Sequence, residues 1–132
     1  MFDASEYWIT VVELPSFARL AGGLLTQEEI DGLILFLANH PDDGDVIPGT
    51  SGLRKIRWAA RGKGKRGGAR IIYYFRDLNM PLYLLTLFSK GERIDLTKAD
   101  KAKFEKVVEE IVQTQWSKQI APRVLRCTKN SA

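Results

Sequence analysis

The chain has 132 residues, of which 45% are hydrophobic, so it can bury one core but is too short to divide comfortably into two domains. Its longest apolar stretches fall far short of the roughly 18–20 residues that span a bilayer, and its first residues have no basic or apolar segment of the secretory kind. We therefore expect a cytoplasmic protein with no membrane segment.

Cysteine and histidine occur once each, as Cys127 and His40. A single thiol excludes an internal disulfide, and the chain lacks the paired His and Cys spacing from which zinc and iron sites are built. The sequence therefore predicts neither a metal nor another cofactor.

The first predicted elements are a short strand and a brief helix. Tyr7–Val12 is rich in aromatic and β-branched residues, which is the composition of a strand. A polar–apolar stretch that begins at Pro15 predicts a helix. We expect this helix to end at Gly22 and Gly23, because a positive φ costs glycine least.

A second helix has clear start and stop signals. Thr26 and Glu29 form a capping-box pattern, in which the threonine accepts a hydrogen bond from the third helical N–H and the glutamate reaches back. The run stops at residues 39–41, which include Pro41. Between these signals, apolar residues recur at helical spacing: Ile30, Leu33, Ile34 and Leu37. Together the two segments predict a helical hairpin.

The middle of the chain predicts an antiparallel sheet. Residues 42–52 are rich in turn formers, with Val46 and Ile47 as a minimal strand. Strands that are joined by short hairpins run antiparallel to each other. Three longer strand candidates follow, joined by a glycine-rich loop and a turn: Leu53–Ala59, Ala69–Arg76 and Leu82–Lys90.

A long amphipathic helix is predicted near the C-terminus, with Thr97 as its cap. Its apolar stripe, which we expect to pack on the sheet, consists of Phe104, Val107, Val108, Ile111 and Val112. Beyond Trp116 the periodicity is lost. The order of elements predicts one α+β domain over residues 1–116, with an extended or flexible tail over residues 117–132.

Charge is distributed very unevenly along the chain. Residues 1–45 hold nine acidic side chains against Arg19 alone, whereas the segment from Val46 to Arg76 holds nine lysines or arginines and no acid. The net charge of +4 is therefore the sum of an acidic N-terminal third and a concentrated basic block. Such asymmetry indicates a surface for nucleic acid or for an acidic partner.

The predicted hairpins bring three of the cations together. If the last hairpin turns near Asn79, Arg70 lies close to Lys90, and the preceding hairpin places Arg57 beside Arg70. Three cations without a carboxylate repel one another unless an external anion completes the site. Arginine forks suit phosphate oxygens, and crowding lowers the pKa of a lysine toward useful proton transfer, so a catalytic phosphate site is one interpretation.

Simpler interpretations of the same residues stay open. A charged glycine-rich loop is often only a solvated hairpin tip, and Arg70 can have a structural role. Arg54, Lys55 and Arg57 alternate on a strand, so they cannot all point to one face without a bulge. The aromatic residues of the strands can stack on bases but are more often core.

The string GDVIPGTSGLRKIRWAARGKGKRGGARIIYYF, from Gly44 to Phe75, continues through YLLTLFSKGERIDLT. It closely resembles the RelE/HigB superfamily of bacterial toxins, and most of all its HigB-type branch. The resemblance is strong over roughly residues 44–112 and loose over the N-terminal strand and helical hairpin. It implies a RelE-like domain, with a compact antiparallel sheet and an N-terminal helical hairpin.

The resemblance also implies a function. Members of the superfamily are ribosome-dependent mRNA endonucleases that enter the ribosomal A site and arrest translation. Their cleavage needs no metal, because the ribose 2′-OH attacks the adjacent phosphate while basic side chains stabilise the transition state. A cognate antitoxin from the same operon, commonly a helix-turn-helix protein, neutralises the toxin, and operator DNA is contacted only through that partner.

The resemblance assigns catalytic roles to Arg70, which matches an arginine of the family, and to Arg57 and Lys90. The sequence departs from RelE because no tyrosine follows Lys90, so the missing role is open to Lys90, Arg93 or Glu92, and His40 lies far from the cluster in sequence. The other basic side chains are predicted to contact RNA: Arg54, Lys55, Arg61, Lys63, Lys65, Arg66 and Arg93.

Two further hypotheses use the same charges. A non-catalytic module that binds RNA or the ribosome needs the basic cluster but leaves the messenger intact. A pure interaction domain needs the cations only to dock an acidic partner, and its partner binding then depends steeply on salt. The sequence does not indicate whether an antitoxin covers the basic surface or docks elsewhere.

Overall fold

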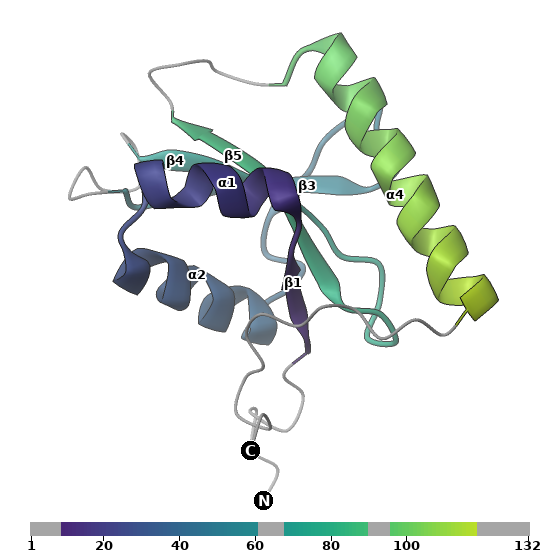
Figure 1. Cartoon of the computed structure of the whole chain (residues 1–132), viewed down its shortest axis with the longest axis horizontal. Helices are drawn as coiled ribbons and strands as arrows, with labels where there is room; N and C mark the ends of the chain where they lie inside the picture. Colours follow the sequence, from purple (N-terminus) through teal and green to yellow (C-terminus); the bar gives the residue numbers. More distant parts are fainter. Residues whose placement is uncertain (1–8, 61–67, 90–95, 119–132) are drawn as a thin grey trace, which may run out of the picture.

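The computed structural model describes residues 9–60, 68–89 and 96–118. Over these residues the chain forms one five-stranded sheet and three helices (Figure 1). The elements are β1 (Val11–Glu13), α1 (Pro15–Leu24), α2 (Gln27–Asn39), β2 (Asp45–Val46), β3 (Leu53–Trp58), β4 (Ala69–Tyr74), β5 (Leu82–Ser89) and α4 (Lys98–Lys118). The predicted α+β class is confirmed.

The sheet is mixed, with strand order β1-β5-β4-β3-β2. The prediction of an antiparallel sheet is correct for β2 to β5, which pair in sequence order. It is wrong for β1, which runs parallel to β5 with Val11 opposite Leu82. The reason is connectivity, because hairpin turns make sequential strands antiparallel, whereas β1 is followed by two helices and meets the last strand of the sheet.

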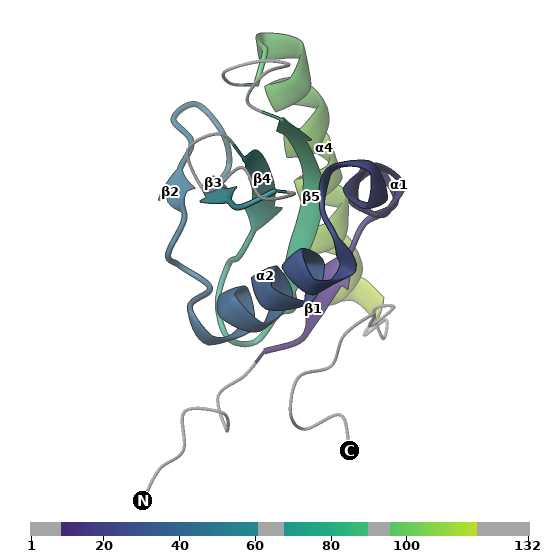
Figure 2. The same ribbon diagram turned by 90° about the vertical axis from the view of Figure 1, so that its left-hand side faces the viewer.

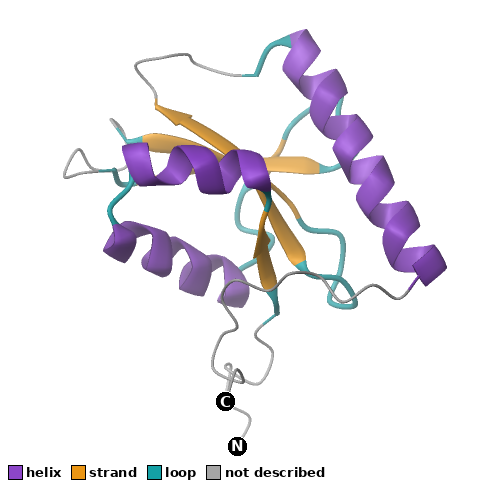
Figure 3. Cartoon of the chain, in the orientation of Figure 1, coloured by secondary structure: helices purple, strands orange, loops and turns teal. Residues whose placement is uncertain are grey.

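Helices cover both faces of the sheet, as Figures 2 and 3 show from two sides. Successive residues of a strand point to opposite faces. On β4, Ile71 and Tyr73 belong to the core cluster that contains α1 and α2, whereas Ile72 and Tyr74 belong to the cluster that contains α4. All six residues of β4 are buried, as expected for a central strand with helices on both sides.

Local signals fix the helix starts. At α2, the side chain of Thr26 accepts from the Glu29 N–H at 3.1 Å, and the Glu29 carboxylate accepts from the Thr26 N–H at 2.8 Å, so the capping box is confirmed. Thr97 caps α4 in the same way, by accepting from the Asp100 N–H at 3.0 Å. Both caps satisfy N–H groups that have no partner within their own helix.

The predicted end of the first helix is wrong by one residue. Gly22 and Gly23 lie inside α1, which runs to Leu24, and among the described glycines only Gly49 and Gly52 have a positive φ. The predicted strands over residues 53–59 and 69–76 are one and two residues too long at the C-terminal end, and the minimal strand is shifted by one residue to Asp45–Val46. The first strand runs one residue beyond Val12, to Glu13, whereas Tyr7 at its predicted start and Lys90 at the predicted end of β5 lie outside the described residues. Helix α4 continues to Lys118, past the predicted boundary at Trp116, and the rest of the predicted tail lies outside the described residues.

No helix in the described part of the chain is long and apolar enough to cross a membrane.

Candidate functional site

Two arginines meet at one end of the sheet. Arg57 of β3 and Arg70 of β4 are directly opposite each other in the antiparallel ladder, as the sequence predicted. Directly opposite residues on paired strands point to the same face and lie about 4.5–5.5 Å apart at Cβ. Arg70 alternates with Ala69 and Ile71, which face α1 and α2, so both guanidinium groups emerge on the α4 face of the sheet.

Arg70 is an unusual arginine because only 9% of it is exposed. Its Nη1 atom is buried and makes no hydrogen bond within the described part of the chain. A buried charged donor without an acceptor is costly, since the Nη1 group has lost water and gained no hydrogen bond in return. The neighbouring Arg57 is exposed and adds a second positive charge. Together they form a site that an external anion would stabilise.

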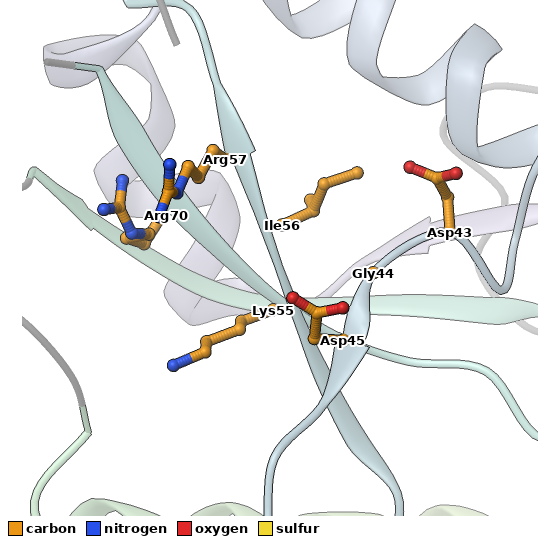
Figure 4. A pocket seen from close by; sticks show the side chains of 7 residues that line it. All are labelled: Asp43, Gly44, Asp45, Lys55, Ile56, Arg57 and Arg70. Atoms are coloured by element: carbon orange, nitrogen blue, oxygen red, sulfur yellow. The ribbon is translucent and has the colours of Figure 1, made fainter. Parts of the chain in front are cut away.

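An open pocket of about 400 Å³ contains this arginine pair (Figure 4). Its lining residues are Asp43, Gly44, Asp45, Lys55, Ile56, Arg57 and Arg70. In the view of Figure 4 the two guanidinium groups lie at one end of the pocket and Asp43 at the other, with Asp45 between them. The pocket therefore has a cationic end and an acidic wall. The sequence did not predict these two carboxylates beside Arg57 and Arg70, and Lys90, the third member of the predicted cation cluster, lies outside the described residues.

The acidic wall, formed by Asp43 and Asp45, lies in and just before the edge strand β2. Strand β2 pairs only with Arg54 and Lys55, and the residues before it, Asp43 and Gly44, line the pocket together with Ile56. A short edge strand thus places acidic side chains from the N-terminal third beside the basic block.

Three side-chain contacts hold this turn in place. The buried Tyr73 hydroxyl accepts a hydrogen bond from the Gly44 N–H at 2.8 Å. Arg54 Nη1 donates to the backbone carbonyl of Gly44 at 2.7 Å and to that of Asp42 at 3.0 Å. We call these residues, Arg54, Tyr73 and Gly44, the rim clamp. Burial raises the pKa of Tyr73 to about 12, although the Gly44 hydrogen bond and the Arg54 charge oppose the shift, so the phenol is neutral at physiological pH.

The structure divides the predicted RNA-contacting residues into three groups. Arg54 has its guanidinium engaged with backbone carbonyls of the turn, on the opposite face of β3 from Arg57. Lys55 lines the pocket on the same side as Arg57. The remaining predictions lie outside the described residues: Arg61, Lys63, Lys65, Arg66, Arg93 and the catalytic candidate Lys90.

The register of the β4–β5 hairpin differs from the predicted one. Arg70 is opposite Phe88, which places Lys90 two residues further along the chain than the partner of Arg70. The difference arises at the turn, because Tyr74 pairs with Tyr83 and the hairpin therefore centres about one residue earlier than predicted. A bulge partly offsets it: Ile72 pairs with Thr86 but Tyr73 pairs with Leu84, so β5 carries one extra residue. Such a bulge has no reliable signature in the sequence.

Sequence reasoning missed Asp43, Gly44, Asp45 and the positioning role of Tyr73. Asp43 and Asp45 look like ordinary turn formers in the sequence, and only the pairing of Asp45 with Lys55 brings them to the arginines. One signal was available in the sequence. A strand of two residues, as predicted at residues 46–47, forms only by pairing with another strand, and β3 is the next strand along the chain. The strand tyrosines are in the core, as the sequence favoured, with Tyr73 fully buried.

Among the described residues, no group of three or more His, Cys, Asp or Glu side chains lies close enough to hold a metal ion. A comparison with protein-family models finds none that matches the chain.

Proposed function

We propose that this protein is the toxin of a bacterial toxin–antitoxin pair, a ribosome-dependent mRNA endonuclease of the RelE/HigB kind. One observation carries the proposal: a nine-tenths-buried Arg70, with an Nη1 atom that has no hydrogen-bond acceptor, stands beside Arg57 in an open pocket. Both arginines lie in the string from Gly44 to Phe75, which resembles that superfamily. We therefore propose that the anion bound here is an RNA phosphate.

The proposed chemistry uses these two arginines on the scissile phosphate. The ribose 2′-hydroxyl loses its proton as its oxygen forms a bond to phosphorus, and the bond to the 5′-oxygen breaks as that oxygen takes up a proton, which leaves a 2′,3′-cyclic phosphate and a 5′-hydroxyl. Negative charge on the non-bridging oxygens increases in the transition state, and fixed guanidinium donors stabilise it without reorganisation. Arg70 is well suited to this role because its buried side chain is already desolvated, and Arg57 adds an exposed fork.

The location, the target and the partner in this proposal are those of RelE/HigB-type toxins. The toxin acts in the cytoplasm, at the A site of a translating ribosome. A cognate antitoxin from the same operon neutralises it, and a helix-turn-helix antitoxin would link the pair to operator DNA. A small helix-turn-helix gene beside this one would support the assignment.

Expression without an antitoxin tests the proposal. Growth should arrest, and new RNA 5′ ends should map to codons in the ribosomal A site. Arg57→Ala and Arg70→Ala should relieve the arrest while circular dichroism shows a folded protein. Arg76→Ala is the matched control, because Arg76 is an exposed arginine just past the other end of β4, beside Asp77.

The outcomes separate the competing functions. Growth arrest without new RNA ends would indicate a non-catalytic module that binds RNA or the ribosome. If the Arg57→Ala and Arg70→Ala proteins cut messenger as well as the parent, the site is wrong.

A further inference from the structure

The acidic wall of the pocket is unexpected in a site for phosphate. Asp43 and Asp45 are exposed, and both line the pocket that contains Arg57 and Arg70. Carboxylates repel a bound phosphate, so on electrostatic grounds alone they weaken anion binding. Their presence in the lining favours a ligand that also carries hydrogen-bond donors, because an ionised carboxylate is an acceptor only.

The wall is also held in a defined position. The Gly44 backbone lies between the two aspartates. Its N–H donates a hydrogen bond to the Tyr73 hydroxyl, and its carbonyl accepts one from Arg54. The packing is so close that a Cβ atom at Gly44 would lie 2.6 Å from the Tyr73 hydroxyl oxygen and 2.9 Å from the Lys55 carbonyl oxygen. A backbone constrained in this way fixes the positions from which the Asp43 and Asp45 side chains extend. Such preorganisation lowers the cost of binding a rigid ligand.

We infer that Asp43 and Asp45 read the donor edge of a nucleobase whose own phosphate is bound by Arg57 and Arg70. A ligand with phosphate at one end and amino donors at the other complements a pocket with a cationic end and an acidic wall. The pocket volume of about 400 Å³ lies within the roughly 300–1,000 Å³ range of small-molecule sites. Aspartate accepting from an exocyclic amino group is an established base contact.

The inference predicts a ranking of bases. Adenine, cytosine and guanine each carry an exocyclic amino group, whereas uracil presents one ring N–H flanked by carbonyl oxygens, which the aspartates repel. Nucleotides with an amino group should therefore bind better than UMP. The inference rests on the proposed function, since it names which nucleotide of a messenger the same pocket accepts.

Binding of the four nucleoside 5′-monophosphates to the purified full chain tests the inference, by calorimetry or by NMR titration. The expected preference of AMP, CMP or GMP over UMP is about fivefold or more, the range that one good base contact gives. In the Asp43→Asn/Asp45→Asn double variant this preference should fall to about twofold or less. UMP and inorganic phosphate should bind that variant more tightly than the parent, because two negative charges are gone.

Asp42→Asn is the matched control. It removes one negative charge from the adjacent exposed position, but the Asp42 side chain does not line the pocket. The nucleotide ranking of this variant should equal that of the parent. Arg70→Ala should abolish competition by inorganic phosphate in every background, because the phosphate end of the pocket is then lost.

Several outcomes would overturn the inference. They are equal affinity for all four nucleotides, no binding of any of them, or an unchanged ranking in the double variant. The last result would show that the aspartates only balance the positive charge nearby, since Asp45 is opposite Lys55 in the β2–β3 ladder. These results leave the proposed function standing if ribosome-bound messenger is still cut. A pocket that ranks nucleotides as expected in a protein that cuts no messenger would overturn the proposed function alone.

Discussion

Gly44 is a position where one added methyl group should be costly. An alanine Cβ there would lie 2.6 Å from the Tyr73 hydroxyl oxygen, 2.8 Å from Tyr73 Cε1 and 2.9 Å from the Lys55 carbonyl oxygen, all shorter than real Cβ contacts allow. Tyr73 is fully buried and Lys55 contributes backbone, so neither can move cheaply. Overpacking costs about 1–3 kcal/mol, and the displaced Gly44–Tyr73 hydrogen bond about 1 kcal/mol more.

We therefore expect Gly44→Ala to lower the free energy of unfolding by about 2–4 kcal/mol. For a chain of this size the midpoint of thermal unfolding should fall by on the order of 10 °C. Gly23→Ala is the control, since Gly23 is helical and exposed and its Cβ would meet nothing within 4 Å. That variant should be neutral or stabilised by up to about 1 kcal/mol.

A double-mutant cycle shows whether the clash has the expected partner. Tyr73→Phe removes the atom nearest to the new Cβ, so Gly44→Ala should cost less in the Tyr73→Phe background than in the parent. A Gly44→Ala protein that unfolds at the parent's temperature would refute the account of the rim clamp. Additive effects of the two substitutions would show that the hydroxyl group is not the limiting contact.

Four further outcomes are expected. Tyr73 has its pKa raised to about 12 by burial, so the stability it contributes is complete below pH 10 and is lost as pH rises toward 12. Tyr73→Phe should remove up to about 3 kcal/mol of this alkaline loss in denaturant titrations at the two pH values. Thr26→Ala should cost about 1 kcal/mol in the same titration, because it deletes the α2 cap. Arg70→Met should abolish messenger cleavage. It should unfold no more easily than the parent, since it replaces a buried charge by an apolar side chain. Clear destabilisation would argue for a structural role of Arg70. His40→Ala should leave growth arrest intact, because His40 caps α2 and does not line the pocket; a folded but non-toxic variant would contradict this.

The helices were predictable because their signals are local. Thr26 and Glu29 are three residues apart, and their reciprocal hydrogen bonds need nothing from the rest of the chain. The pairing of Arg57 with Arg70 was predictable for a similar reason, since only residues 59–68 separate their strands in the sequence. In both cases the relevant geometry is set by residues close in sequence.

The parallel pairing of β1 and the acidic wall depend on distant partners. Nothing near Val11 in the sequence specifies that it lies opposite Leu82, because the pairing follows from packing of α1 against β5. The Gly44–Tyr73 contact spans 29 residues and depends on the register of two strand pairs. Glycine at position 44 carries no turn signal either, since its φ is not positive and the requirement comes from crowding alone.

The acidic N-terminal third and the basic block, separated in the sequence, meet at the pocket through a strand of two residues. With so few ladder pairs, strand β2 alone is a weak support for the turn that carries Asp43 and Asp45. The turn is held by Tyr73 from the core and by Arg54 from the opposite face of β3, neither of which lines the pocket. Selectivity for a base, if the acidic wall provides it, should therefore weaken in Tyr73→Phe although the substituted atom never touches the ligand, whereas affinity for inorganic phosphate, set by Arg57 and Arg70, should be retained.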